Sequence, residues 1–419
     1  MKFRKIKLIS LITTFVFLFL GKYNSQTYNA AGQEGQEEIN TITTAVPFLL
    51  ISPDSRSGAM GDVGAAIKPD ANSVFWNPAK LVFIEEGDDI GFSMSYSPWL
   101  RALVNDINLA YLTFYKRIDR NSTIGGSLRY FSLGNITFTD AFGETIRDFK
   151  PNEFSLDVVY SRKLSANLGV GLAARYIYSN LTGGSLVSGA ATRPGQSVAT
   201  DLSAYYVTNK FEISDMPSDI AFGLNISNIG AKMSYTENAD RDFIPTNMRL
   251  GTALNIEIDD YNEFTFAFDA NKLLVPTQPF VAIIGKEETI ISGSDPNVGV
   301  ASGMFNSFSD APGIVITDDN GNYVVEEGSK FKEELNEINL SVGAEYIYSQ
   351  LFAIRGGYFH EHPTKGNRRY LSFGAGIKYK VLELDLSYLL ALTQQSPLAN
   401  TIRFSLKFNM GDVEETPSN

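Results

Sequence analysis

An alternation of apolar and polar residues recurs along most of this chain and limits what it can fold into. In "LELDLSYLL" (residues 382–390) and "TIRFSLKFN" (residues 401–409), apolar residues stand at almost every second position. A period of two residues is typical of β-strands that have one apolar face. Fourteen such segments begin near Ile90, Ile107, Thr123, Glu153, Leu168, Val198, Ile220, Met248, Glu263, Ile338, Phe352, Arg369, Leu382 and Thr401. The chain is therefore expected to be all-β.

The connections between these segments alternate in length. Those after even-numbered segments are mostly short, such as "SQ" and "VLE", with "NKFEISDMPSD" as the exception. Most of those after odd-numbered segments are longer, at about 133–151, 179–197, 230–246 and 272–336. This parity, with strands of about ten residues, is the pattern of an outer-membrane barrel. A soluble β-sandwich is the alternative, but its strands average about five or six residues. The sequence predicts a 14-stranded antiparallel transmembrane β-barrel over 89–410, with a long extracellular loop at about 275–336.

Closure of the sheet satisfies every backbone N–H and C=O within the hydrocarbon, so the apolar face is expected to meet lipid and the polar face to line the lumen. We expect the charges on the polar face to pair and fill the lumen, and a charged conduction path is the alternative. These charged residues are Asp157, Arg175, Asp201, Arg249, Glu257, Asp269, Glu345, Arg355, Asp385 and Arg403. Tyrosines near strand ends, which are typical of interfacial girdles, are Tyr96, Tyr115, Tyr160, Tyr178, Tyr348 and Tyr379.

Residues 1–25 have the pattern of a secretory signal peptide. A basic start, "MKFRKIK", precedes an apolar run over residues 8–20, and cleavage is expected near Ser25. An N-terminal membrane anchor is the alternative, although the run is shorter than the ~20 residues of a spanning helix. The sequence therefore predicts export, with the barrel in the outer membrane of a Gram-negative cell.

Residues 26–88 lack the alternation and are rich in small residues. A fourteen-stranded barrel is wider than its own side chains can fill. We therefore expect an N-terminal arm that continues into a plug inside the lumen, and a periplasmic linker is the alternative. Asn77, Pro78 and Ala79 are expected to form a turn in this plug, because Asn-Pro is a turn signal. Behind the last strand, residues 411–419 are expected to form a short acidic tail.

Charge and the rare residue types narrow the chemistry. The chain has 35 basic and 47 acidic residues and a net charge of −12, which disfavours nucleic acid as a partner. Cysteine is absent, so the chain forms no disulfide and is no lipoprotein. The two histidines, His360 and His362, are too few for a metal site. We expect no enzyme, no catalytic or cofactor-binding residues and no metal, and a hydrolase that uses one histidine as its base is the alternative.

The rim of the long-loop side offers candidate contacts for partners or substrates. Trp99 and Leu100 lie in the first hairpin, and His360 and His362 lie at the end of the eleventh segment. The loop over about 275–336 contains ten acidic residues and three lysines and is longer than a hairpin needs. The alternatives are an interfacial anchor at Trp99 and a solvated surface flap for the loop.

Four stretches of the sequence, taken in order, resemble one known group of proteins. They are "SPDSRSGAMGDVGAA" (52–66), "NSVFWNPAKL" (72–81), "SYSPWLRALVNDINLAYL" (95–112) and "RGGYFHEHPTKGNRRYLSFGAG" (355–376). They are similar to the FadL-like family of outer-membrane transporters for hydrophobic compounds. Within that family they resemble the PorV (LptO) group of the type IX secretion system of Bacteroidetes. The resemblance covers essentially the whole mature chain.

This resemblance implies a role in protein transport. PorV-like proteins pair with a giant translocon barrel, SprA (Sov), and bind exported proteins through their C-terminal signal domains. They carry these proteins to a surface attachment complex that contains a PorU-like sortase. The resemblance thus implies a carrier that stands in outer-membrane lipid and is not a pore. A FadL-type transporter of hydrophobic small molecules and an LPS O-deacylase are the alternatives.

Overall fold

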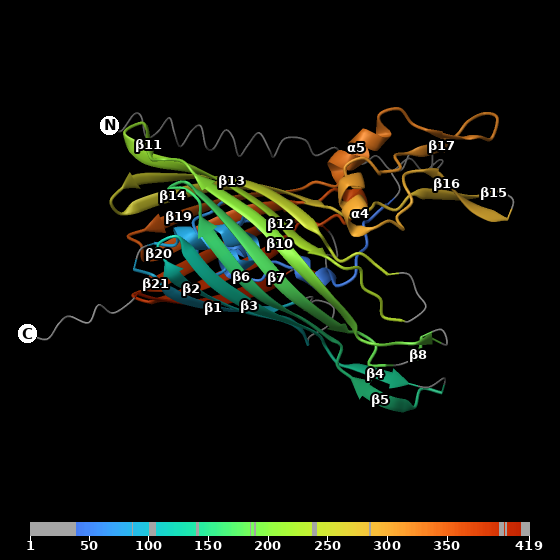
Figure 1. Cartoon of the computed structure of the whole chain (residues 1–419), viewed down its shortest axis with the longest axis horizontal. Helices are drawn as coiled ribbons and strands as arrows, with labels where there is room; N and C mark the ends of the chain where they lie inside the picture. Colours follow the sequence, from blue (N-terminus) through green and yellow to red (C-terminus); the bar gives the residue numbers. More distant parts are fainter. Residues whose placement is uncertain are drawn as a thin grey trace, which may run out of the picture.

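Fourteen long strands form a closed antiparallel barrel (Figure 1). The computed structural model describes residues 39–85, 87–99, 106–139, 142–184, 186–187, 190–236, 241–284, 286–393, 398 and 400–411. The barrel strands are β1 (Ile90–Pro98), β2 (Ile107–Asp119), β3 (Ser122–Leu133), β6 (Asn152–Lys163), β7 (Leu168–Asn180), β10 (Gly195–Val207), β12 (Met216–Gly230), β13 (Asn247–Asp259), β14 (Asn262–Leu273), β19 (Asn339–Tyr348), β20 (Phe352–His360), β21 (Arg369–Tyr379), β22 (Leu382–Ala391) and β23 (Thr401–Met410). Each pairs with its neighbours along the chain, and β1 pairs with β23 to close the barrel.

The predicted fold class is confirmed, and the strand starts lie close to the predicted ones. The largest difference is at β12, which begins at Met216 and not at Ile220. The cause is a small hairpin, in which β11 (Phe211–Ile213) pairs with the first residues of β12. This hairpin also explains why one connection on the short-turn side is longer than the others. The predicted signal peptide, Leu100 and residues 412–419 of the acidic tail lie outside the described residues.

Burial alternates along the barrel strands as the hydrophobic pattern predicts. On β22, Leu384 and Leu386 are exposed toward lipid, whereas Asp385 is fully buried in the lumen. The prediction that Tyr115 belongs to an interfacial girdle is wrong, because its side chain is buried inside the barrel against Ala71 and Val74, which precede β1. An alternating pattern reports a period but not the side that an amphipathic tyrosine faces. Among the described residues, no helix is both long and apolar enough to cross a bilayer.

The stretch ahead of β1 lies inside the barrel, where Figure 1 draws it in blue. We call residues 45–84 the plug. It contains four short helices, η1 (Pro47–Leu50), α2 (Ser55–Ala59), α3 (Ser73–Trp76) and η2 (Pro78–Phe83). Small residues allow it to pack closely, since a Cβ on Gly64 would collide with the Trp76 ring and a Cβ on Gly357 of the wall would collide with the Met60 backbone. The hydrophobic core of the molecule therefore lies between plug and wall.

The long connections lie together at one end of the barrel, at the right in Figure 1. They carry the hairpins β4 (Ile136–Thr139) with β5 (Thr145–Phe149) and β8 (Leu186–Val187) with β9 (Ala190–Ala191). The longest connection, residues 274–338, is folded, and we call it the cap. It contains β15 (Phe280–Ile284), β16 (Glu287–Ser292), α4 (Val300–Asn306), β17 (Val315–Thr317), β18 (Tyr323–Val325) and α5 (Ser329–Asn336).

Candidate functional site

Asn77 and Pro78 form a turn that ties the plug to the wall. The Asn77 side chain accepts a hydrogen bond from the Ala79 N–H (3.1 Å), and its amide donates to the Ala204 carbonyl of β10 (3.0 Å). Pro78 stands in the first turn of η2, where its missing N–H has no helical partner to lose. Its carbonyl accepts from the Ser161 hydroxyl of β6 at 2.6 Å. The "NPA" turn therefore positions η2 against two strands of the wall.

The aromatic pair Phe75–Trp76, just ahead of this turn, lies between two arginines of the wall. The Arg249 guanidinium of β13 stands 4.4 Å from the centre of the Trp76 ring, and that of Arg129 of β3 stands 4.5 Å from the Phe75 ring. The Trp76 indole N–H donates to Asp54 at 2.6 Å. The attraction between a cation and the face of an aromatic ring is stronger when both groups are buried. This pair is therefore the point where the middle of the plug is held from two sides.

Side chains of the wall also accept hydrogen bonds from the backbone of the plug. The N–H of Ser55 donates to Ser405 of β23 (2.8 Å), and that of Gly61 donates to Ser372 of β21 (2.8 Å). Gly64 and Ala65 both donate to one oxygen of Asp269 on β14, at 2.8 and 2.9 Å. A plug with little regular structure leaves many N–H groups without helical or strand partners, and the wall supplies acceptors for them.

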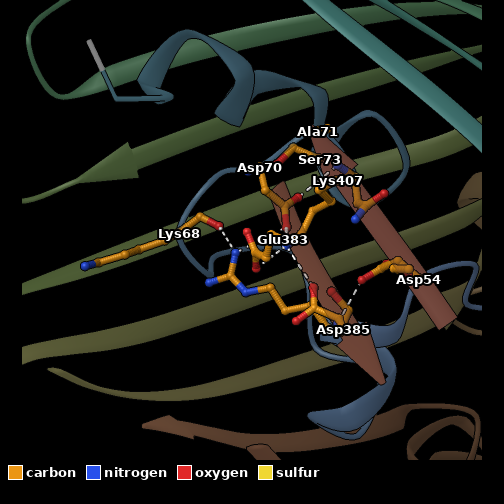
Figure 2. A network of polar contacts seen from close by, with 12 residues as sticks. Asp54, Lys68, Asp70, Ala71, Ser73, Glu383, Asp385 and Lys407 are labelled. Carbon is orange, nitrogen blue, oxygen red and sulfur yellow. Dashed lines mark hydrogen bonds and ion pairs between the residues drawn. The ribbon is translucent and has the colours of Figure 1, made fainter. Parts of the chain in front are cut away.

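A buried ion network joins the plug to strands β19–β23. Arg56 of the plug forms two hydrogen bonds with Glu345, at 2.8 and 3.0 Å, and also contacts Asp70 at 3.3 Å. Figure 2 shows Lys407 among three carboxylates, Asp70 (3.4 Å), Glu383 (2.7 Å) and Asp385 (3.0 Å). Removing one member of such a network would leave an uncompensated buried charge. The network thus opposes movement of the plug.

Of the ten charged residues predicted for the lumen, eight are buried there: Asp157, Arg175, Asp201, Asp269, Glu345, Arg355, Asp385 and Arg403. Arg249 also faces the plug, at Trp76. Glu257 is the exception, because it lies at the short-turn end and pairs with the exposed Lys210.

A cavity of about 310 Å³ lies at the short-turn end, between the plug and the wall. Its lining combines charged groups such as Arg56, Glu345 and Lys378 with apolar side chains.

At the other end, Glu333 and Glu334 of α5 and Glu337, the residue that follows this helix, fix the cap to the barrel rim. Glu337 binds Lys272 of β14 (2.6 Å) and Lys365 of the β20–β21 turn (3.1 Å). Glu333 also binds Lys365 (2.6 Å), and Glu334 binds Lys272 (3.1 Å). The contacts with Lys272 join the last residues of the cap to β14, the strand from which the cap starts. The predicted long loop is therefore folded and bonded to the rim.

One further carboxylate of this cluster responds to pH. Burial raises the pKa of Asp310 to about 6, the charges of Glu334 and Glu337 add to the rise, and the Thr277 N–H opposes it. A raised carboxyl pKa favours folding while the group is protonated, and this contribution is lost as pH rises through about 6. We expect backbone amides of the cap to exchange hydrogen more slowly at pH 5.5 than at pH 7.5, after correction for the intrinsic rate. Asp310→Asn should abolish the difference, and an unchanged difference in that variant would contradict the assignment.

The cap exposes apolar side chains beyond the ends of the barrel strands. Phe305 of α4 and Phe331 of α5 are 78% and 70% exposed, and Ile283 of β15 is 75% exposed. Such side chains are expected on the lipid face of a barrel, but the cap stands past the strands that cross the membrane (Figure 1). Exposed apolar groups with a charged surround are typical of surfaces that bind a partner.

Trp99, one of the predicted contact residues, is partly buried and packs toward Phe359, Tyr370 and Leu389, with Arg403 over its ring at 5.9 Å. His360 contacts the Tyr358 hydroxyl at 3.1 Å.

His362 contacts the Thr364 hydroxyl at 2.9 Å and caps the short helix η3 (Pro363–Lys365). Across the part of the chain that the structure describes, no group of three or more potential metal ligands is present. Both histidines therefore belong to the geometry of the β20–β21 turn.

Several residues that hold plug and cap escaped the sequence analysis. The wall serines Ser203, Ser372 and Ser405 stand at polar positions of alternating strands, and that position was the signal for a lumenal role. The α5 glutamates stand within "KEELNE", whose spacing places them along one helix face.

Comparison with known proteins places this chain in a family. A family model described as "Type IX secretion system protein PorV" matches residues 33–280. No curated protein sequence matches the chain. Similar solved structures include the toluene transporter TbuX of Ralstonia pickettii, with 13% identity, 85% of this chain and 98% of that chain covered, and a TM-score of 0.45. The toluene transporter TodX of P. putida has 12% identity, covers 85% and 98%, and has a TM-score of 0.46.

A FadL homologue of Pseudomonas aeruginosa has 11% identity, covers 88% of this chain and 99% of its own, and has a TM-score of 0.42. Likenesses at this level do not assign a substrate. The family model, in contrast, spans more than half of the sequence. The chain therefore belongs to the family of type IX secretion system protein PorV and is an outer-membrane component of that system.

Proposed function

We propose that this barrel binds exported proteins by their C-terminal signal domains at the translocon and carries them to the surface attachment complex. The partners are then a SprA (Sov)-like translocon barrel and a complex with a PorU-like sortase. The observation that carries the proposal is the plug, which is bonded to the wall from β3 to β23. A lumen occupied in this way leaves no route for a polypeptide. Contact with cargo is therefore made from outside the lumen, without a catalytic step.

The cap is the surface that best fits this role. It faces away from the membrane-crossing strands, it is folded, and it presents the exposed side chains of Phe305 and Phe331. Long loops of outer-membrane barrels stand on the extracellular side. Cargo bound there is already outside the membrane and can be passed to an attachment complex.

The two other functions receive less support. A transporter of hydrophobic small molecules needs an apolar cavity, whereas the cavity beside the plug has charged groups in its lining. An O-deacylase would draw its base from His360 or His362, whose Nδ1 atoms are held by Tyr358 and Thr364.

Replacing Phe305 and Phe331, the two most exposed phenylalanines of the cap, by serine should reduce cargo binding without loss of the barrel. Burying one phenylalanine at an interface contributes about 2 kcal/mol, so losing two should lower the amount of surface-attached exported protein at least tenfold. Surface and supernatant fractions would be compared with the parent strain, and heat-modified gel mobility would report barrel folding. Phe142→Ser is the matched control, because Phe142 is even more exposed than Phe305 and Phe331 but lies in the loop between β4 and β5. Normal surface attachment with Phe305→Ser/Phe331→Ser would remove these residues from the mechanism.

A further inference from the structure

The first described residues of the chain lie at the long-loop end, among the loops. The Asn40 N–H donates to the Thr364 carbonyl in the β20–β21 turn at 3.0 Å. The Asn40 side-chain amide donates to the Gln278 carbonyl and to Glu333 of α5, both at 3.1 Å. Ile39, one residue earlier, is 78% exposed. The plug thus enters the barrel from the mouth that the cap adjoins.

The other end of the plug leaves at the opposite mouth. The Arg117 side chain, near the β2–β3 turn, donates to the carbonyls of Ile84 (2.6 Å) and Glu85 (3.1 Å). From there the chain reaches Ile90, where β1 begins opposite Lys116. Between the two mouths the plug is buried and bonded to the wall. The chain therefore passes lengthwise through its own barrel before it forms the first strand.

We infer that residues 39–44, which lead into the plug, lie on the extracellular side and fasten the cap there as a strap. This inference rests on the proposed function, which places the cap on the extracellular side. Glu333 is the residue on which the strap acts. It accepts from Asn40, from Lys365 (2.6 Å) and, through its other oxygen, from the Gly313 N–H (2.8 Å). Asn40 thus joins three parts of the rim: the foot of the cap at Gln278, the helix α5, and the β20–β21 turn.

The absence of cysteine allows the topology to be tested by labelling single introduced thiols. Three full-length variants are compared on intact cells with a membrane-impermeant maleimide: Ile39→Cys at the start of the strap, Asn320→Cys in the exposed turn of the cap, and Ala166→Cys in the exposed β6–β7 turn. We expect the first two to label on intact cells and the third to label only after the outer membrane is disrupted. Labelling of Asn320→Cys without Ile39→Cys on intact cells would overturn the inference and leave the proposed function standing. Labelling of Ala166→Cys in place of Asn320→Cys would instead show that the proposed orientation is wrong.

The fastening role has its own test. Asn40→Asp places a carboxylate against Glu333 and should increase tryptic cleavage at Lys330 and Lys332 severalfold in the purified barrel. Ile39→Asp is the control, because it adds the same charge one residue away on an exposed side chain and should cleave like the parent. Equal cleavage of Asn40→Asp and the parent would show that the arm does not hold the cap.

Discussion

Replacing Trp76 by alanine should loosen the plug while the barrel stays closed. The indole is fully enclosed, donates to Asp54 and lies under the Arg249 guanidinium, so its loss leaves a cavity and removes the donor to one buried oxygen of Asp54. Large-to-small replacement of a buried tryptophan costs about 3–5 kcal/mol. The ladder bonds of the wall do not involve Trp76, so heat-modified mobility should be unchanged.

Single-channel recording in planar bilayers would measure this effect. The parent protein should pass little current, and Trp76→Ala should show openings that the parent lacks. Phe83→Ala is a suitable control, because Phe83 lines the cavity at the short-turn end and is only partly buried. A Trp76→Ala protein that is as stable as the parent and passes no more current would show that the aromatic pair does not hold the plug.

Replacing Arg56 by methionine should have an effect of similar size. Methionine fills much of the space, but it leaves Glu345 with one arginine partner and removes a cation beside Asp70. Breaking a buried charge network by removing one partner costs about 3–5 kcal/mol. Urea titration of the detergent-solubilised protein, followed by gel mobility, would measure the loss.

A double variant separates charge from packing. Arg56→Met/Glu345→Gln removes both partners of the bidentate pair and should be more stable than Arg56→Met alone, because the network then loses one carboxylate together with one cation instead of a cation alone. Equal stability of the single and double variants would indicate that the Arg56 side chain contributes by packing and not by its charge.

The barrel was predictable because its determinants are local. Alternation over ten residues reports which face of a strand meets lipid, and the parity of connection lengths reports how the strands are joined, so the strand starts could be read from "LELDLSYLL" and similar segments. The β11 hairpin escaped this reasoning because three residues are too few to show a period. Tyr115 was placed on the wrong face for a related reason, since its hydroxyl and ring suit both an interface and a plugged lumen.

The candidate site was less predictable because long-range contacts build it. The cap is held by Lys272 with Glu337 and by Asn40 with Glu333, pairs that are far apart in the sequence. Nothing near Trp99 in the sequence indicates that residues of β20, β21 and β22 surround it. The plug itself was expected, since a wide barrel needs filling, but its partners on the wall depend on the register of the closed sheet.

The central claim is that cargo never passes through the lumen, and a reversible lock on the plug tests it most directly. The Ser55 N–H and the Ser405 hydroxyl lie 2.8 Å apart, so Ser55→Cys/Ser405→Cys should allow a disulfide between plug and wall in a chain that otherwise has no cysteine. The measurement is the amount of exported protein at the cell surface with the lock oxidised and then reduced, with each single variant as a control. The account predicts equal amounts in both states. Secretion that stops when the lock is oxidised and returns when it is reduced would contradict it, because the plug would then have to move for cargo to cross.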